Sequence, residues 1–370
     1  MTDGMTPGHI YKEHGEILYY LSKIYGCNCI ADDFIDPAGS FGEKFRTVKL
    51  HSYSCRRFIH LKKFAYLFKK AKNIDILYLL CITPDSMYSM LAYRLGGGRG
   101  KIFLKTDLGL YEKDGKDLLK WENMTIFLKI VHCIFKIFPD VMTVETRNGY
   151  SRLQSSYYGS LVSEGKLYYL PNGVDPEILV DNNIRRKKIY EKEKLIITVG
   201  RIGTYQKNTE LLLDILSAIN LKDWKVKIIG GIESSFQQVI ENFYLKNPEK
   251  RQSVLFTGSV SQKELWEYYN KSRIFIFTSR HESYGLALSE AMYMGDYVIT
   301  TNVGIASELS DFNPCYISQT WDKHEFIVEL NRIIGMNDEQ LNDLMPDKPC
   351  DDITWEYVLR NNEAMHKLFG

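Results

Sequence analysis

The sequence predicts an α/β protein of two domains, each built on a parallel β-sheet with helices on both faces. Short apolar runs alternate with helix-like segments through both halves of the chain, which is the pattern of repeated βαβ units. The length of 370 residues also favours two domains over one. A turn sequence, Pro-Asn-Gly-Val-Asp at 171–175, separates the two alternations, and we place the domain boundary near Asn172.

The first domain is predicted to span residues 1–171. It opens on a Gly/Pro-rich loop at 1–9, so the first strand of its sheet is expected to be short or missing. Apolar runs predict strands at 27–31, 47–50, 74–81, 101–105, 141–145 and 167–170. Helical patterns predict helices at 16–25, 58–71, 86–95, 117–137 and 148–158.

The second domain is predicted to span residues 172–352. A charged, apolar-poor connector at 181–194 leads into it. Strands are predicted at 195–199, 225–229, 254–257, 273–277 and 297–301. Helices are predicted at 209–219, 233–245, 262–271 and 284–294, and a terminal helix occupies 353–368.

Charge is divided unevenly between the halves. Residues 1–170 contain 24 Lys and Arg against 17 Asp and Glu, whereas the remainder contains 23 against 29. A basic half can face an anionic surface. The segment 58–71 is a basic amphipathic helix, which fits either an anionic membrane or, more usually, a core helix with a solvated outer face. The basic residues in and around it are Arg56, Arg57, Lys62, Lys63, Lys69, Lys70 and Lys72. Nucleic acid is not expected as a partner, because the net charge is only +1 and no nucleic-acid motif occurs.

The cysteines and the apolar segments indicate a cytoplasmic protein. The 7 cysteines are scattered, with no C-x-x-C pair, as is typical of reduced thiols rather than of disulfides or a zinc site. The first 15 residues are polar, so no signal peptide is predicted. The longest apolar region, 126–138, is interrupted by Lys129, His132 and Lys136, so no membrane span is predicted.

The stretch 278–292 carries the strongest signal in the chain. It leads from an apolar strand into an Ala/Leu/Met helix, and such a junction presents backbone N–H groups and the positive end of the helix dipole to an anion. Two carboxylates flank the junction, Glu282 in the loop and Glu290 in the helix. The rise from Gly285 to Glu290 is roughly 7–8 Å, close to the reach from a diphosphate to its nucleoside ribose. Glu290 has apolar neighbours, so it needs either a partner within the protein or a ligand hydroxyl.

Two cations follow the first strand of the second domain. Gly200 and Arg201 end that strand, and Lys207 lies at the start of the next helix. Arg grips two phosphate oxygens at once and Lys acts as a point charge, so the pair suits a diphosphate. By itself the pattern is also compatible with two surface cations. A dinucleotide fingerprint is excluded, since the third Gly of G-x-G-x-x-G is missing.

These motifs, in this order, resemble the retaining, family 4 type glycosyltransferases of the GT-B fold. Glu282 and Glu290 match the two ends of the E-x7-E motif, Arg201 and Lys207 match the phosphate-binding pair, and 171–175 matches the segment between the two halves. Residues 302–308 are similar to the G-G-x-x-E segment, with Val303 where a Gly is common. The match is specific over about 171–308. It implies two Rossmann-like domains facing an interdomain cleft, with residues 353–370 crossing back to the first domain.

The resemblance also implies roles for single residues. Glu282 would approach the hydroxyls of the donor sugar, and Glu290 would hold the ribose. Gly230 and Val260 would contact the nucleobase. Backbone groups would cover the sugar and diphosphate at Ser283, Tyr284, Gly285 and Leu286. No metal ion and no cofactor are expected, because no Asp-x-Asp occurs and the fixed cations can take up the charge of the leaving diphosphate.

The acceptor side would lie in the first domain. Asp107 follows a predicted strand, so it either orients an acceptor hydroxyl, acts as a weak base, or caps the following turn. The resemblance implies transfer of a hexose-type sugar from a nucleoside diphosphate sugar, such as a UDP-sugar, to a glycan or polyprenyl-linked saccharide. Capsule and lipopolysaccharide synthesis are the expected settings, with contact to the inner face of a membrane through the basic domain. A nucleotide-sugar epimerase and a non-catalytic scaffold subunit remain alternatives. A phosphorylase is a weaker alternative, because no signature of a pyridoxal lysine is evident.

Overall fold

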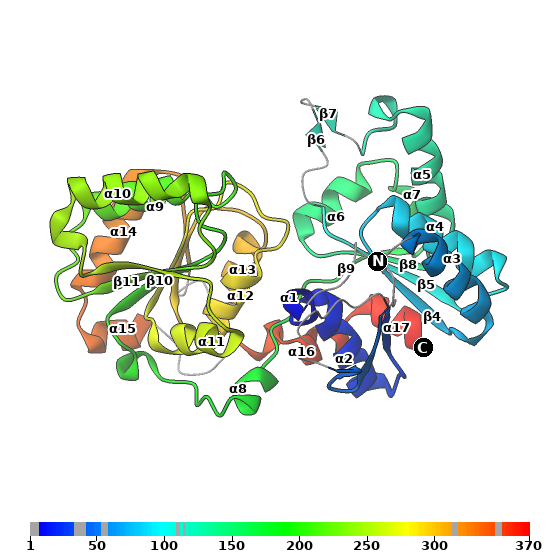
Figure 1. Cartoon of the computed structure of the whole chain (residues 1–370), viewed down its shortest axis with the longest axis horizontal. Helices are drawn as coiled ribbons and strands as arrows, with labels where there is room; N and C mark the ends of the chain where they lie inside the picture. The colour runs from blue at the N-terminus through cyan, green and yellow to red at the C-terminus, as the bar shows by residue number, and fades with distance from the viewer. Residues whose placement is uncertain are drawn as a thin grey trace. The chain divides into compact units, whose positions relative to one another are not determined.

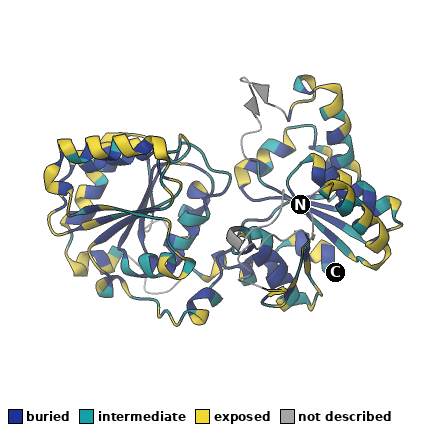
Figure 2. Cartoon of the chain, in the orientation of Figure 1, coloured by how far each residue is buried: buried dark blue, intermediate teal, exposed yellow. Residues whose placement is uncertain are grey.

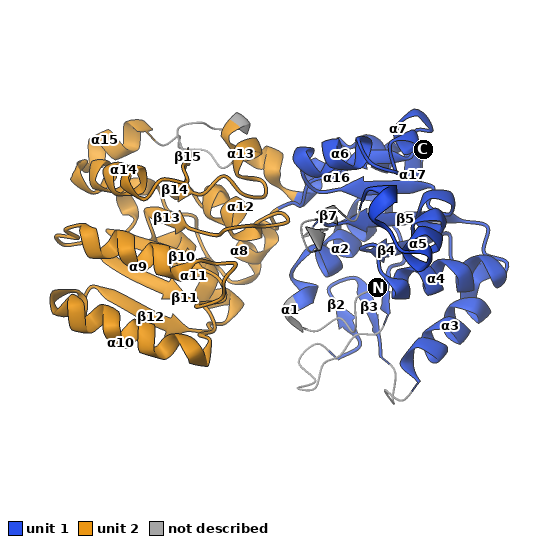
Figure 3. Ribbon diagram, turned by 90° about the horizontal axis from the view of Figure 1, so that it is seen from above, with its two compact units in different colours: residues 1–173, 355–370 blue, residues 174–354 orange. Residues whose placement is uncertain are grey.

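The computed structural model describes residues 7–32, 42–52, 58–108, 112–113, 116–117, 119–312, 317–344 and 350–370 (Figure 1). Contacts divide the chain into two compact units (Figure 3). Unit 1 contains residues 1–173 and 355–370, and unit 2 contains residues 174–354. The boundaries predicted from the sequence, after residues 171 and 352, each lie two residues earlier. The terminal segment Trp355–Gly370 therefore belongs to unit 1.

Unit 1 is built on a four-stranded parallel sheet in the order β4-β5-β8-β9. These strands are β4 (Ile76–Leu80), β5 (Lys101–Thr106), β8 (Val141–Val144) and β9 (Leu167–Tyr169). A separate sheet joins β1 (Ile30–Asp32) in parallel to β3 (Val48–His51), which pairs antiparallel with β2 (Lys44–Phe45). A short hairpin consists of β6 (Glu112–Lys113) and β7 (Lys116–Asp117). Among the described residues before Ile30, the chain forms only the helices α1 (Pro7–Ile10) and α2 (Glu13–Tyr25).

Helices cover both faces of the four-stranded sheet. Leu77, Ile102 and Met142 point into one core, whereas Phe103 and Val141 point into the other, as alternation along a strand requires. The first core is covered by α3 (Ile59–Lys70), α4 (Pro84–Leu95), α5 (Ile126–Ile137), α6 (Arg147–Gln154) and α7 (Ser160–Ser163). The second core is covered by α2, α16 (Trp355–Arg360) and α17 (Glu363–Phe369). Figure 2 shows that the buried residues gather along the strands and on the sheet-facing sides of the helices, whereas the exposed residues lie on the outer sides of the helices.

Two helix predictions in unit 1 are wrong. The helix predicted at 117–137 begins only at Ile126, after a 3₁₀ turn at Trp121–Asn123, because the Thr125 hydroxyl caps it by accepting from Leu128 N at 3.3 Å. The terminal helix predicted at 353–368 is interrupted between α16 and α17. There the Asn362 side chain caps α17 by accepting from Ala364 N at 3.0 Å.

Unit 2 is built on a six-stranded parallel sheet in the order β12-β11-β10-β13-β14-β15. Its strands are β10 (Leu195–Val199), β11 (Lys225–Ile229), β12 (Val254–Gly258), β13 (Ile274–Phe277), β14 (Tyr297–Thr300) and β15 (Ile317–Gln319). The edge strand β15 was not predicted. The central strands are buried on both faces, and their side chains belong to one continuous apolar core.

Eight helices among the described residues of unit 2 surround this sheet. They are α8 (Glu177–Asp181), α9 (Thr209–Ala218), α10 (Gln237–Lys246), α11 (Gln262–Lys271), α12 (Leu286–Tyr293), α13 (Ala306–Phe312), α14 (Lys323–Gly335) and α15 (Asp338–Leu344). In α11, Ser261 forms a capping box with Glu264, which explains why this helix begins where the sequence predicts. In the part of the chain that the structure describes, none of the helices combines the length and apolarity that crossing a bilayer demands.

The fold of unit 1 should weaken in mild acid because of His132. This α5 residue is 3% exposed, its Nδ1 lies 2.6 Å from the Tyr158 hydroxyl, and burial lowers its pKa from 6.5 to about 4. Between these values the unfolded chain binds a proton that the folded chain does not, so stability falls as pH decreases, by up to about 1.4 kcal/mol per pH unit. Urea unfolding of the full chain at several pH values between 7 and 4 measures this slope, with hydrogen exchange in peptides from unit 1 as the readout. His132→Gln should reduce the slope, whereas the exposed control His324→Gln should not; an equal slope in all three proteins would contradict the assignment.

Candidate functional site

The sheet of unit 2 places its first candidate site residues side by side. Along the chain the strands run outward from β10 to β12 and then return to the other side of β10 with β13. Ligands of open α/β sheets bind at the carboxyl ends of the strands where the strand order reverses in this way. The loop after β10 carries Arg201 and Lys207, and the loop after β13 carries Glu282. These predicted residues therefore lie at the reversal point.

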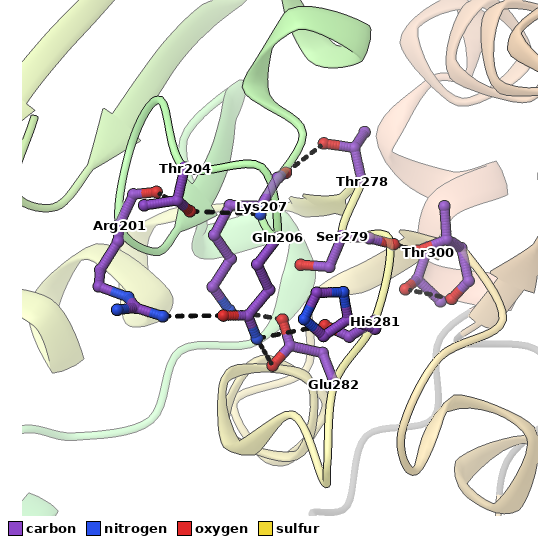
Figure 4. A network of polar contacts seen from close by, with 10 residues as sticks. Arg201, Thr204, Gln206, Lys207, Thr278, Ser279, His281, Glu282 and Thr300 are labelled. Atoms are coloured by element: carbon purple, nitrogen blue, oxygen red, sulfur yellow. Dashed lines mark hydrogen bonds and ion pairs between the residues drawn. The ribbon is translucent and has the colours of Figure 1, made fainter. Parts of the chain in front are cut away.

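Four side chains from these two loops form one connected network (Figure 4). Lys207 Nζ lies 2.6 Å from Glu282 Oε1. Gln206 Nε2 donates to Glu282 Oε2 at 3.3 Å, and Gln206 Oε1 accepts from Arg201 Nη2 at 2.8 Å. The side chains of Lys207 and Glu282 are 18% and 9% exposed, while Arg201 is exposed. The network thus brings two cations and one carboxylate together with an excess of positive charge.

Backbone contacts hold the two loops against each other. Arg280 N donates to Gln206 O at 2.8 Å, and the Thr278 hydroxyl donates to the carbonyls of Lys207 and Asn208 at 3.3 and 3.2 Å. These contacts fix the backbone position of Lys207.

The Lys207 side chain packs against Gly200 and the ring of Phe277. Its stem passes so close to Gly200 that a Cβ there would lie 3.0 Å from Lys207 Cδ. Its Nζ lies 4.7 Å from the centre of the Phe277 ring. A side chain at position 200 would therefore press against the lysine stem and force it to shift.

The second carboxylate of the motif has a protein partner. The Tyr269 hydroxyl, on α11, donates to Glu290 Oε2 on α12 at 2.9 Å. Tyr269 is completely buried, and burial, followed by the Glu290 charge, raises the pKa of its hydroxyl well above 10. The hydroxyl therefore stays protonated and donates to the half-buried Glu290 carboxylate.

The turn before α12 depends on two glycines. Gly285 has φ 92° and Gly304 has φ 56°, both in the left-handed region. A Cβ on Gly304 would lie 2.1 Å from Tyr284 O, which accepts from Ile305 N at 2.7 Å. The ring of Tyr284 is buried in the unit 2 core, so its predicted ligand contact is through its backbone. The predicted contacts of Ser283, Gly285 and Leu286 lie on the same turn and first helical residue.

The two predicted nucleobase contacts lie on the other side of β10. Gly230 directly follows β11 and has φ 137°, and a Cβ there would lie 1.8 Å from Gly200 O. Its N–H donates to Gly258 O at 2.9 Å. The fold alone thus demands glycine at position 230, independently of any ligand. Val260 is partly buried against the unit 2 core, and its contact with a base stays a prediction.

Unit 1 carries the remaining predicted residue, Asp107, at the end of β5. Its carboxylate accepts from the Cys81 thiol at 3.0 Å, and Cys81 follows the neighbouring strand β4. Further along the same edge, buried Lys105 lies 3.9 Å from buried Glu145, which accepts from Asn172 Nδ2 at 2.7 Å. Burial raises the pKa of Glu145 to about 8. The carboxyl ends of the unit 1 strands thus gather titratable groups around Asp107.

Two site residues escaped the sequence reasoning. Gln206 links Arg201 to Glu282, and its position directly before Lys207 in the same loop is the signal that could have found it. Tyr269 precedes Glu290 by 21 residues and reaches it only through the packing of α11 near α12. No local sequence pattern marks that contact.

Comparison with known proteins identifies the second unit. The model of the glycosyl transferases group 1 family matches residues 180–340. Alpha-monoglucosyldiacylglycerol synthase of Streptococcus pneumoniae is 29% identical over 139 residues, 35% of this chain and 31% of that protein. The amylovoran biosynthesis glycosyltransferase AmsD of Erwinia amylovora is 29% identical over 148 residues, 39% of each chain. The matched segments thus span about a third of the length of these curated relatives.

Comparison of structures extends the likeness to nearly the whole chain. HepE of Anabaena, in complex with UDP-glucose, superimposes with a TM-score of 0.64 at 14% identity, covering 96% of this chain and 93% of that one. WaaG, a glycosyltransferase involved in lipopolysaccharide biosynthesis, gives a TM-score of 0.59 at 13% identity, covering 97% and 92%. Residues 180–340 therefore belong to the glycosyl transferases group 1, and the chain that carries them has the GT-B fold.

Proposed function

We propose that this protein transfers a hexose-type sugar from a nucleoside diphosphate sugar to a glycan or polyprenyl-linked saccharide. The observation that carries the proposal is the network in which Arg201, Gln206, Lys207 and Glu282 connect at the reversal point of the unit 2 sheet. Cations fixed at this edge suit a diphosphate, and a carboxylate beside them suits the hydroxyls of the attached sugar.

The proposed chemistry needs charge stabilisation where the leaving group departs. As the bond between the sugar and the diphosphate breaks, negative charge grows on the diphosphate oxygens. Arg201 and Lys207 are the cations that we assign to receive that charge, and no metal ion is assigned to the step. For a diphosphate to reach Lys207, its oxygens must compete with Glu282, which the ammonium group contacts at 2.6 Å. Retention of the anomeric configuration belongs to this proposal through the family resemblance.

The setting of the reaction is also a proposal. The relatives named above include a glycolipid synthase, an amylovoran biosynthesis enzyme and a lipopolysaccharide biosynthesis enzyme. We therefore place the acceptor in capsule or lipopolysaccharide synthesis, on the cytoplasmic side of a membrane. Asp107 and the polar edge of unit 1 are assigned to the acceptor hydroxyl.

A calorimetric screen of nucleoside diphosphates and their sugars tests the proposal directly. We expect UDP or another nucleoside diphosphate to bind the full chain, and its sugar derivative to be hydrolysed slowly or transferred to an added acceptor. Titration with inorganic pyrophosphate separates the diphosphate contacts from those of the nucleoside. Absence of binding to every nucleotide tested would contradict the proposal, and conversion of the donor to its epimer would favour an epimerase instead.

Glu290→Gln should weaken nucleotide binding while sparing pyrophosphate. A carboxylate that accepts from ribose hydroxyls contributes a charged hydrogen bond, and its loss should lower UDP affinity by about tenfold to a hundredfold. Pyrophosphate has no ribose, so its affinity should stay at the wild-type value. Tyr269→Phe, which removes the hydroxyl that donates to Glu290 at 2.9 Å, is the matched variant and should have a smaller effect. An equal loss for both ligands in Glu290→Gln would show that Glu290 supports the fold and not the ribose.

A further inference from the structure

Gln206 contacts three consecutive residues of the loop that carries Glu282. Its backbone carbonyl accepts from Arg280 N at 2.8 Å. Its side-chain Nε2 donates to His281 O at 3.2 Å and to Glu282 Oε2 at 3.3 Å (Figure 4). Gln206 thus connects the loop after β10 to the loop after β13 through both its backbone and its side chain.

The orientation of the Gln206 amide is determined by its partners. Its oxygen accepts from Arg201 Nη2 at 2.8 Å, while its N–H groups face a carboxylate and a backbone carbonyl. The opposite orientation would turn the N–H groups toward a guanidinium, which can only donate, and the amide oxygen toward two acceptors. The half-buried side chain is therefore held in one position between Arg201 and Glu282.

Glu282 is held at both carboxylate oxygens by donors of different kinds. Oε1 contacts the Lys207 ammonium group at 2.6 Å, and Oε2 accepts from the Gln206 amide at 3.3 Å. Each carboxylate oxygen can accept more than one hydrogen bond, so a ligand hydroxyl can still donate to it. The direction in which Glu282 presents its remaining acceptor positions depends on these two donors.

We propose that Gln206 is a positioning residue that determines the preference among donor sugars. The inference rests on the proposed function, in which Glu282 accepts from hydroxyls of the sugar. By holding Oε2, Gln206 fixes which positions on a sugar ring the carboxylate can reach. A sugar with the opposite configuration at such a position leaves the carboxylate without that bond, so epimeric sugars bind with different affinities.

The neutral charge of the Gln206 amide suits it to this role. The phosphates of a bound donor attract the Lys207 ammonium group, and they attract Arg201 in the same way. Both cations then exchange contacts within the network for contacts with the ligand. The amide carries no charge that a phosphate could draw away, so its N–H groups stay directed at His281 O and Glu282. Gln206 thus keeps the carboxylate in place while the cations bind the diphosphate.

A merely structural role for the Gln206 side chain is a weaker explanation. The two loops are already joined by the backbone bond from Arg280 N to Gln206 O at 2.8 Å. They are also joined by the Thr278 hydroxyl, which donates to Lys207 O at 3.3 Å. Both of these bonds survive any substitution of the Gln206 side chain. The side chain therefore adds the orientation of Glu282 to an attachment that other bonds provide.

Gln206→Met tests the inference, because methionine has a similar length and cannot form the hydrogen bonds of the amide. Sugar preference is measured by calorimetry with the full chain, as the ratio of the Kd values for the poorest and the best of UDP-glucose, UDP-galactose and UDP-N-acetylglucosamine. We expect Gln206→Met to lower this ratio about threefold to tenfold, the usual contribution of one hydrogen bond. The affinities for UDP and for pyrophosphate, which have no sugar to recognise, should not fall.

Two further variants and a control show whether Gln206 acts through Glu282. Gln206→Glu keeps an acceptor for Arg201 but replaces the N–H donors by a second carboxylate, so it should lose the preference at least as fully as Gln206→Met. In the Glu282→Ala background, Gln206→Met should change the preference no further. Gln238→Met is the matched control, because Gln238 is exposed on α10 and its side chain donates to Asn242 at 3.2 Å; this variant should have the wild-type preference.

The inference is overturned if the wild type binds the three UDP-sugars equally, or if Gln206→Met or Gln206→Glu keeps the wild-type preference. It is also overturned if Gln206→Met lowers the preference as much in the Glu282→Ala background. An equal loss of affinity for UDP, pyrophosphate and the UDP-sugars would mean that Gln206 acts on the diphosphate through Arg201. In all of these cases the wild type binds UDP and the proposed function stands. If the wild type binds neither UDP nor any UDP-sugar, the proposed function is wrong for UDP donors, and this inference is wrong with it.

Discussion

Lys207→Ala should lower the affinity of the protein for UDP and for pyrophosphate alike, by about a hundredfold. A hydrogen bond from a charged donor contributes roughly 1.5–3 kcal/mol, and the variant also leaves the Glu282 carboxylate without the cation that it contacts at 2.6 Å. That carboxylate would then repel the phosphates from the same position. Isothermal titration with both ligands measures the loss, and thermal unfolding in parallel shows whether the fold is intact.

Glu282→Gln supplies the second half of a double-mutant cycle. If Lys207 and Glu282 act as a pair, Lys207→Ala with Glu282→Gln should bind UDP more tightly than Lys207→Ala alone, since the repelling charge is gone. Glu282→Gln alone should bind UDP at least as well as the wild type but transfer sugar more slowly. Lys225→Ala is the control, because Lys225 begins β11 at the opposite end of the sheet. Additive effects of the two substitutions would mean that the contact has no role in diphosphate binding.

The fold of unit 2 was predicted closely because its signals are local and strong. The bounds of β10, β11 and α11 agree with the structure, since each is a compact apolar run or a capped helix. In unit 1 the segment 117–137 reads as one continuous pattern, and only the cap at Thr125 shows where the helix starts. The strand β15 has only three residues, so no pattern of alternation can develop in it.

The candidate site was predictable as a set of residue types but not as a geometry. Motif spacing predicted Arg201, Lys207 and Glu282, yet their proximity depends on the pairing of β10 with β13, strands about 80 residues apart in the chain. Tyr269 illustrates the limit most clearly. Its hydroxyl contacts Glu290 through tertiary packing alone, so neither its neighbours nor its spacing marks it in the sequence.

Glycines show how fold and function overlap in such predictions. Gly230 was predicted as a nucleobase contact, but a side chain at this position would overlap with Gly200 O. The residue type is therefore explained by the close approach of two backbones. A motif glycine at a strand end is evidence for the fold first, and for a ligand only when a binding measurement supports it.

Asp296→Asn should destabilise unit 2 by about 3–5 kcal/mol, the usual cost of breaking a buried ion pair. Asp296 Oδ1 lies 2.5 Å from Lys192 Nζ, and both side chains are completely buried. Ser272 donates to the other carboxylate oxygen at 2.7 Å, and Lys192 also donates to Tyr269 O at 3.0 Å. The variant would leave the lysine charge in the core without its counter-charge. Urea unfolding of the full chain, with hydrogen exchange read in peptides that contain β10 and β13, measures the loss of unfolding free energy in unit 2 separately from unit 1.

A matched exposed pair and an apolar replacement make this prediction specific. Lys194 and Asp223 form an ion pair at 2.6 Å with both side chains largely exposed, so Asp223→Asn should unfold like the wild type. Burial raises the pKa of Asp296 to about 6 despite its partners, which shows how strongly removal from water opposes its charge. Lys192→Met with Asp296→Leu should therefore be more stable than either single variant, because it removes both buried charges. If Asp296→Asn also weakens UDP binding and the double variant restores it, the buried ion pair supports Glu290 by holding Tyr269 in position. If the double variant is instead as unstable as Asp296→Asn, the hydrogen bonds to Ser272 and to Tyr269 O carry the stability, and the prediction is wrong.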